Sequence, residues 1–189
     1  MSRRRTLSEW ERARQRLKPD AVTLLFVGES PPAGGTFFYY ANSRLYDATK
    51  EAFRIAVPSL VRGDNFLERF KGLDCYLDDL CLEPVNHLKL DNPLAKKKRL
   101  ALREQGEEPI AKRMRANPPQ AVIVVMKGIE PNVRAALALA DSDGLRVDSL
   151  PFPARPEHRA RYVSELAAIL KEHRRRGVLR AEGGDRREA

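Results

Sequence analysis

Four short apolar runs, each followed by a segment with helical spacing, constrain the fold of this chain more than any other feature. The runs occupy residues 20–30, 73–85, 120–128 and 145–153. The first and third are almost wholly apolar and rich in β-branched residues, which indicates strands covered on both faces. Strands that alternate with helices predict a parallel sheet with helices on both sides. We therefore expect an α/β fold of three layers, built around a central parallel sheet of about four strands.

The segments between these runs are mostly predicted to be helical. Helices are expected over residues 6–17, 43–57, 64–71, 108–116, 130–140 and 155–176. Residues 86–106 are polar and contain a charge run, so they are predicted to form either a mobile loop or an exposed helix. We expect the folded domain to span residues 21–174. A basic, helical arm (1–20) would precede it, and a charged tail (175–189) would follow it.

The chain is basic, with a formal net charge of +9 from 35 Lys and Arg against 26 Asp and Glu among its 189 residues. This excess favours an anionic partner such as nucleic acid, a nucleotide or a membrane surface. Part of the excess lies near the two ends of the chain, where solvated basic residues are also common in ordinary enzymes. Basicity alone therefore leaves two interpretations open: a protein that binds DNA or another nucleic acid, and an ordinary enzyme with solvated basic ends.

Two further patterns bear on location and metal binding. No segment has the apolar length needed to span a bilayer, and the first residues lack the apolar region of a signal peptide. We therefore expect a soluble, cytoplasmic protein that does not enter a membrane. Cys75 and Cys81 are too few for a four-cysteine metal site and their spacing matches no usual metal motif. They are predicted to be buried, reduced thiols, and no metal is expected.

Candidate ligand-binding residues lie at the ends of the predicted strands, at the edge where a parallel sheet binds its ligands. Glu29 follows the first strand, Asp79 ends the second, Lys127 follows the third and Phe152 follows the fourth. A carboxylate at the end of a buried strand needs a partner or a use. Glu29 is thus either catalytic or a loop-fixing carboxylate that accepts backbone N–H bonds. Ser30 fits turn chemistry better than a nucleophile, because no G-x-S-x-G elbow surrounds it.

The residues between the first strand and the next helix resemble the uracil-DNA glycosylase superfamily, most closely its mismatch-specific uracil/thymine branch. That branch has G-I-N-P-G at a strand end, then a Gly-Thr-Gly and aromatic stretch, then Asn-Arg-Phe-Trp at a helix start. Here the counterparts are Gly28-Glu29-Ser30-Pro31, Gly34-Gly35-Thr36-Phe37-Phe38 and Asn42-Ser43-Arg44-Leu45-Tyr46. The segment 117–137 is similar to the central strand and helix of the superfamily. The segment 147–170 lies where the family has its second motif and last helix.

The resemblance implies an enzyme that flips a base out of DNA, stacks it on an aromatic ring and cleaves the bond between base and sugar. In that case Glu29 positions water or stabilises the cationic sugar, and one ring of residues 37–40 stacks on the base. About two of those four rings are expected in the core. The candidate catalytic residues are Glu29 and Ser30; the candidate base-binding residues are Gly28, Pro31, Phe37, Phe38, Tyr39, Asp79, Phe152 and Arg155.

Phosphate contacts are expected from basic residues near the strand ends. Lys127, after the third strand, is the best single candidate for a contact to a phosphate or ligand. The internal basic run comprises Lys96, Lys97, Lys98 and Arg99. It is either a solvated helix face or a contact to the DNA backbone, and the latter would show a steep salt dependence.

The sequence departs from the family at both motifs. Ser30 stands where the mismatch-specific branch has Asn, and a serine is not a carboxylate base. Glu29 compensates in part, because a cluster-containing branch has Glu at this place, although its iron–sulfur cysteines are absent here. In the second motif Phe152 replaces Asn or His, and Ala154 replaces Ser. Losing one donor to the leaving base costs about 10²–10³ in rate; the charge of Arg155 is the possible substitute.

These departures leave three hypotheses. The first is a DNA glycosylase with atypical motifs, which requires no metal or organic cofactor. The second is a catalytically inactive module on the same fold that binds nucleic acid or a protein partner, and Phe152 favours it. The third is an enzyme or binder for a small nucleotide. No pattern indicates the oligomeric state.

Overall fold

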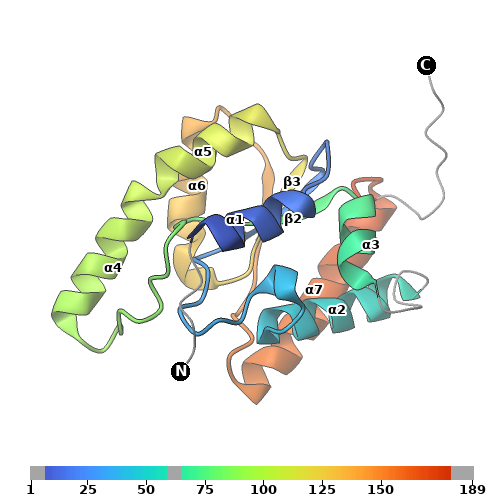
Figure 1. The fold of residues 1–189 in the computed structure, drawn as a ribbon. Helices are drawn as coiled ribbons and strands as arrows, with labels where there is room; N and C mark the ends of the chain where they lie inside the picture. Colours follow the sequence, from blue (N-terminus) through green and yellow to red (C-terminus); the bar gives the residue numbers. More distant parts are fainter. Residues whose placement is uncertain (1–6, 59–64, 180–189) are drawn as a thin grey trace.

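The computed structural model describes residues 7–58 and 65–179, and its centre is a parallel four-stranded sheet (Figure 1). The strands are β1 (Leu24–Gly28), β2 (Cys75–Asp79), β3 (Ala121–Val124) and β4 (Arg146–Ser149). They lie in the order β2-β1-β3-β4, and every neighbouring pair is parallel. The predicted α/β class and the predicted number of strands are therefore confirmed.

Burial follows position in the sheet. Every residue of β1 and β3, the two central strands, is buried, as the apolar runs predict. Phe26 pairs with Leu77 on one side and with Ile123 on the other, so it lies at the centre of the core. The edge strand β4 is only half-buried, and its Arg146 and Asp148 form an ion pair along the strand with a 2.9 Å contact.

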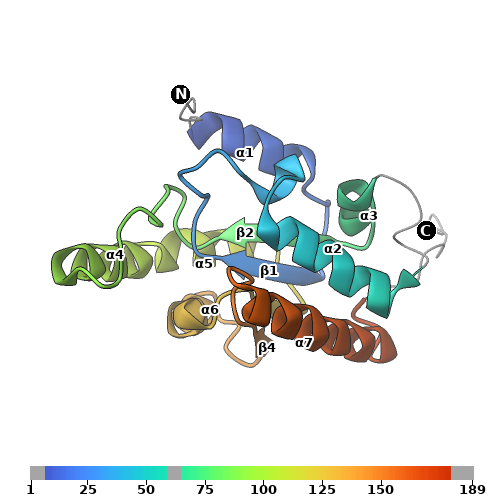
Figure 2. The same cartoon turned by 90° about the horizontal axis from the view of Figure 1, so that it is seen from below.

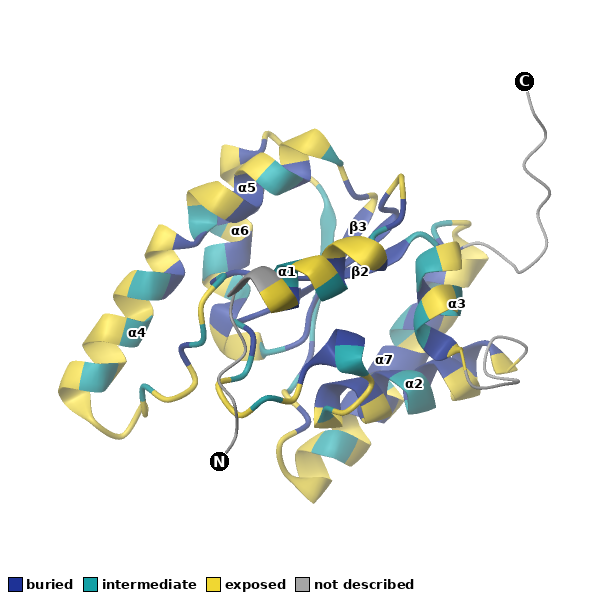
Figure 3. Cartoon of the chain, viewed as in Figure 1, coloured by how far each residue is buried: buried dark blue, intermediate teal, exposed yellow. Residues whose placement is uncertain are grey.

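Helices cover both faces of the sheet. They are α1 (Leu7–Arg16), α2 (Arg44–Ala56), α3 (Phe66–Gly72), α4 (Pro93–Gln105), α5 (Glu107–Ala116), α6 (Glu130–Leu139) and α7 (Pro156–Arg175), with short 3₁₀ helices η1 (Phe38–Tyr40) and η3 (Lys127–Ile129). Figures 1 and 2 show α5 and α6 on one face, and α2, α3 and α7 on the other. The dark blue residues of Figure 3 mark the buried interior between these layers. None of the helices in the described ranges is long and apolar enough to cross a membrane.

Helix α1 lies beside β2 and contributes to the interior of the domain (Figure 2). Trp10, Arg14 and Leu17 are all buried, and Lys71 of α3 donates to the carbonyl of Arg16. The sequence assigned this helix to an arm at residues 1–20. In the structure it covers the β2 edge of the sheet. Of the predicted tail, residues 180–189 lie outside the described part of the chain.

Helix α4 settles the open prediction for residues 86–106, because it is an exposed helix that projects from the body (Figures 1 and 3). Asn92 caps its first turn by accepting from Ala95 N at 3.1 Å, and Pro93 occupies the first turn. Leu94 is 82% exposed, whereas Arg103 is buried. A charged residue rather than an apolar stripe thus attaches α4 to the domain.

Candidate functional site

A cavity of about 520 Å³ opens at the carboxyl ends of the strands, where the sequence predicts a site. Much of its lining comes from the end of β1 and the turn after it, from the segment that leads into α2, and from the loop after β4. These residues are Gly28, Glu29, Ser30, Pro32, Thr36, Phe37, Phe38, Asn42, Ser43, Arg44, Leu45, Asp47 and Phe152. Asn86, Arg99 and Met126 complete much of the wall. This volume is in the range of small-molecule sites, and its mixture of aromatic and polar groups is typical of them.

Glu29 is buried at the cavity wall and is bound by two arginines of α4. Arg99 Nε donates to Oε1 at 2.7 Å and Arg99 Nη2 donates to Oε2. Arg103 Nε donates to Oε1 at 2.8 Å, and its Nη2 lies 2.6 Å from the same oxygen. The two arginines are one helical turn apart and therefore share a face of α4. Glu29 anchors α4 to the end of β1, with arginine side chains as partners in place of backbone N–H groups.

One acceptor position of Glu29 stays available. A carboxylate has about four lone-pair positions. Among the described residues, both guanidinium groups bind Oε1, but only Arg99 binds Oε2. Since Glu29 lines the cavity, Oε2 can accept one more hydrogen bond from a water or a ligand.

Ser30 and Pro31 shape the turn that follows Glu29. Ser30 Oγ accepts from Val85 N at 3.2 Å, which ties the loop after β1 to the loop after β2. Asn86 Oδ1 accepts from Ala33 N at 3.0 Å and makes the same link from the other side. Pro31 is buried and does not line the cavity, whereas Ser30 and Asn86 do. The serine therefore has the turn role that the sequence favours.

Gly28 and Asp79 lie opposite each other at the ends of β1 and β2. A Cβ added at Gly28 would lie 2.5 Å from Asp79 Oδ1, so this close approach requires glycine. Arg14 Nη2 donates to Asp79 Oδ2 at 2.7 Å. Burial raises the pKa of Asp79 to about 6, although the charge of Arg14 opposes the shift. The cavity wall thus contains a carboxyl group that titrates near neutral pH.

Asp78, the neighbour of Asp79, binds a second arginine in addition to Arg14. Its Oδ2 accepts from Arg113 Nε at 2.7 Å, and its Oδ1 accepts from Asp79 N at 2.8 Å. Arg14 Nη1 lies 3.6 Å from Asp78 Oδ1. Arg14 Nη1 also donates to Glu11 Oε2 at 3.1 Å, so three carboxylates and two arginines form one network at the end of β2.

Phe37 and Phe38 line the cavity but are nearly completely buried, with exposures of 2% and 3%. Asn42 Oδ1 accepts from Phe37 N at 2.8 Å and holds the segment in place. Phe38 packs on Tyr39 and Phe70 with ring centroids 5.2 and 5.4 Å apart. These two rings are part of the core, and Tyr39 is equally buried, so three of the four rings lie in the core where about two were expected.

Tyr39 has a structural position away from the cavity wall. Its hydroxyl donates to Leu77 O at 2.9 Å and accepts from Leu77 N at 2.8 Å. Leu77 is on β2, the edge strand, so these backbone groups have no neighbouring strand. The tyrosine completes the hydrogen bonding of the sheet edge, and burial raises its pKa well above the ordinary value.

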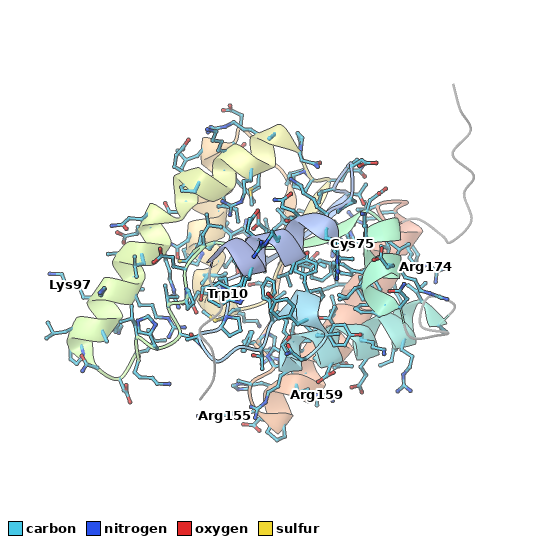
Figure 4. All side chains as sticks on the ribbon, viewed as in Figure 1. Trp10, Cys75, Lys97, Arg155, Arg159 and Arg174 are labelled. Carbon is cyan, nitrogen blue, oxygen red and sulfur yellow. The ribbon has the colours of Figure 1, made fainter. Side chains whose placement is uncertain are left out.

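Phe152 lies in the cavity wall with 38% of its surface exposed, the highest exposure among the phenylalanines there. Arg155 is exposed, precedes α7 and is not part of this wall (Figure 4). Instead Arg44, at the start of α2, reaches across and donates to Ala154 O at 2.6 Å. The loop after β4 thus presents an aromatic ring to the cavity, and Arg44 fixes that loop.

The predicted phosphate contacts divide into two groups. Lys127 is exposed in η3, and Lys96, Lys97 and Lys98 are exposed on α4; Figure 4 shows Lys97 pointing away from the body. These lysines do not line the cavity. Arg99, the fourth residue of the run, faces the opposite way and binds Glu29. One four-residue run therefore supplies both a solvated face and a buried contact.

Sequence reasoning missed Arg14 and Arg103, which bind the cavity carboxylates Asp79 and Glu29. Arg14 belonged to a predicted arm, and nothing in its local sequence indicates burial. For Arg103 the sequence does contain a signal. Arg99 and Arg103 are four residues apart, so both would lie on one face of a helix over residues 86–106. No cluster of His, Cys, Asp and Glu suited to a metal ion occurs within residues 7–58 and 65–179. Cys75 and Cys81 are buried and unpaired.

Comparison of the chain with models of protein families and with curated proteins gives no match. The resemblance to the uracil-DNA glycosylase superfamily therefore depends on the motifs themselves.

Proposed function

We propose that this protein recognises a nucleobase in the strand-end cavity and acts on DNA as an atypical member of the uracil-DNA glycosylase superfamily. One observation carries the proposal: the separate segments on which the resemblance rests meet in a single cavity. Gly28–Ser30, Thr36–Phe38, Asn42–Leu45 and Phe152 all line it. The carboxyl ends of parallel strands meet at one edge of any such sheet. The support for the resemblance is that the residues of its motifs form the wall of the cavity at that edge.

The cavity offers groups suited to a planar heterocycle. Phe152 has an accessible ring for stacking, which makes it a better candidate than the buried Phe37 and Phe38. Asn86 uses its Oδ1 internally, so its amide N–H₂ is available to a ligand. The replacement in the second motif thus exchanges a hydrogen-bond donor for a stacking surface.

The reaction would be hydrolysis of the N-glycosidic bond. Water held by Glu29 Oε2 attacks the anomeric carbon, the bond between that carbon and the base nitrogen breaks, and the base leaves with the bonding electrons. The water proton passes to the carboxylate or to the departing base. Arg99, beside Glu29 at the wall, is the cation nearest to the proposed water position and stabilises negative charge on the base.

A second candidate function is base or nucleic-acid binding without cleavage. Two arginines already neutralise Glu29, and Phe152 donates no hydrogen bond to a leaving group. Both features weaken catalysis while leaving recognition intact.

A cleavage assay separates the two candidates. The full chain is incubated with labelled oligonucleotides that carry uracil, hypoxanthine, xanthine or a G·T mismatch, and alkali-labile sites are counted. Glu29→Gln removes the carboxylate charge in the cavity, and Glu104→Gln makes the same change at an exposed position of α4. Cleavage that only Glu29→Gln abolishes supports the glycosylase. Binding without cleavage supports the binding module, and neither binding nor cleavage contradicts a DNA function.

A further inference from the structure

The cluster of Glu29, Arg99 and Arg103 at the cavity wall carries an excess of positive charge. Glu29 supplies one negative charge, and Arg99 and Arg103 supply two positive charges, which leaves +1. The three side chains are only 5–11% exposed. Within the described residues, neither arginine forms an ion pair with any other carboxylate. In the neighbouring network at the end of β2, Arg14 and Arg113 pair with Asp78, Asp79 and Glu11. The extra carboxylate, Glu11, is 40% exposed, so solvent screens its charge from the cluster around Glu29.

A net charge in a poorly solvated site calls for a counter-charge. Arg99 is the member of the cluster that lines the cavity. Its guanidinium has five N–H groups, of which two bonds go to Glu29 and one goes to Leu88 O at 3.0 Å. Two N–H groups of Arg99 therefore have no acceptor among the described residues.

Two further donors lie next to this cluster. Ser30 follows Glu29 directly, and because its Oγ accepts from Val85 N, its hydroxyl proton is available to a ligand. Asn86 follows Val85, and its Nδ2 has no acceptor among the described residues. Both side chains line the cavity together with Arg99. Serine, amide and guanidinium donors around a net positive charge form a site for a tetrahedral oxyanion.

We infer that the ligand of this cavity carries an anionic group with the chemistry of a phosphate, and that Arg99, Ser30 and Asn86 bind it. This inference rests on the proposed function, because it specifies the ligand of the same site. Together with Phe152 at the far wall, the subsite fits a nucleoside phosphate, with the phosphate on a free nucleotide or within a DNA strand.

The test compares matched ligands by isothermal titration calorimetry on the full chain. Deoxyuridine and deoxyinosine are titrated against their 5′-monophosphates, with inorganic phosphate as the isolated group. The monophosphates should bind roughly ten- to a hundredfold more tightly than the nucleosides, the effect expected for hydrogen bonds to a charged group. Arg99→Gln should remove this advantage. Lys112→Gln, which removes the same charge from an exposed position of α5, should leave it intact.

A second variant, which changes the charge of the cluster in the opposite direction, distinguishes a loss of charge from a loss of structure. Glu29→Gln raises the net charge of the cluster from +1 to +2, so monophosphate binding should become tighter. General loosening of α4 would instead weaken binding in both Arg99→Gln and Glu29→Gln, and that parallel loss would overturn the inference. A short single-stranded oligonucleotide is then added as a competitor of the monophosphate. If it competes with the wild type but not with Arg99→Gln, the phosphate of the natural ligand belongs to DNA. If it does not compete with the wild type, the phosphate belongs to a free nucleotide.

The remaining outcomes separate this inference from the proposed function. Nucleosides that bind as tightly as their monophosphates would overturn the anionic subsite and leave base recognition standing. Inorganic phosphate that binds through Arg99, without any gain from an attached nucleoside, would support the subsite and contradict base recognition. Failure of every phosphate compound to bind would overturn the inference.

Discussion

Replacing Tyr39 by phenylalanine tests whether this residue closes the sheet edge or serves as a stacking ring. The substitution removes one oxygen and keeps the ring. Two hydrogen bonds are lost, and both the N–H and the C=O of Leu77 are left without a partner in a buried strand. An unsatisfied buried group costs about 1–3 kcal/mol, so we expect a loss of about 3 kcal/mol in unfolding free energy. For a chain of this size that corresponds to a fall of roughly 6–12 °C in Tm.

Urea unfolding followed by far-ultraviolet circular dichroism measures this loss, and an unchanged m-value would show that the compactness of the two states is preserved. Tyr162→Phe is the matched control. It also removes a buried tyrosine hydroxyl, but that hydroxyl bonds only to Thr49 Oγ1 at 2.9 Å. Thr49 can turn to a carbonyl of its own helix, so the control should lose only about 1 kcal/mol. Equal losses in the two variants would refute the edge-closing role of Tyr39.

Three further predictions follow from the cavity and its surroundings. The folded pKa of Asp79, about 6, exceeds its ordinary value near 4, so the folded chain binds that proton more tightly and Asp79 reduces stability as pH rises from about 4 to about 6. The unfolding free energy of Asp79→Asn should therefore increase relative to that of the wild type as pH rises through this window. A difference in urea titrations that does not depend on pH would contradict the raised pKa of Asp79. Gly28→Ala should destabilise by roughly 1–3 kcal/mol because its Cβ meets Asp79, whereas Gly34→Ala, with open space around it, should stay within about 0.5 kcal/mol in the same assay. If α4 contacts DNA, Lys97→Gln should lower the slope of log binding constant against log salt by about one, and an unchanged slope would exclude a phosphate contact.

The sequence alone was sufficient for the fold class and the number of strands. The β-branched runs around Phe26 and Ile123 have no polar face, and only a sheet covered on both sides can bury them. Alternation of such runs with helical segments leaves a parallel sheet as the consistent solution. Parallel strands end at the same edge, so the meeting of Glu29, Asp79 and Phe152 near one site was predictable without coordinates.

The partners of those side chains depended on the tertiary structure. Glu29 is 70 residues from Arg99 and 74 from Arg103 along the chain, and Asp79 is 65 from Arg14. Hydrophobic periodicity carries no information about which arginine approaches which carboxylate, because in the sequence these arginines look like solvated surface charges. Only the packing of α1 against β2 and the docking of α4 on the strand end bring them together. The local sequence therefore determined where the site lies, and long-range packing decided its charge.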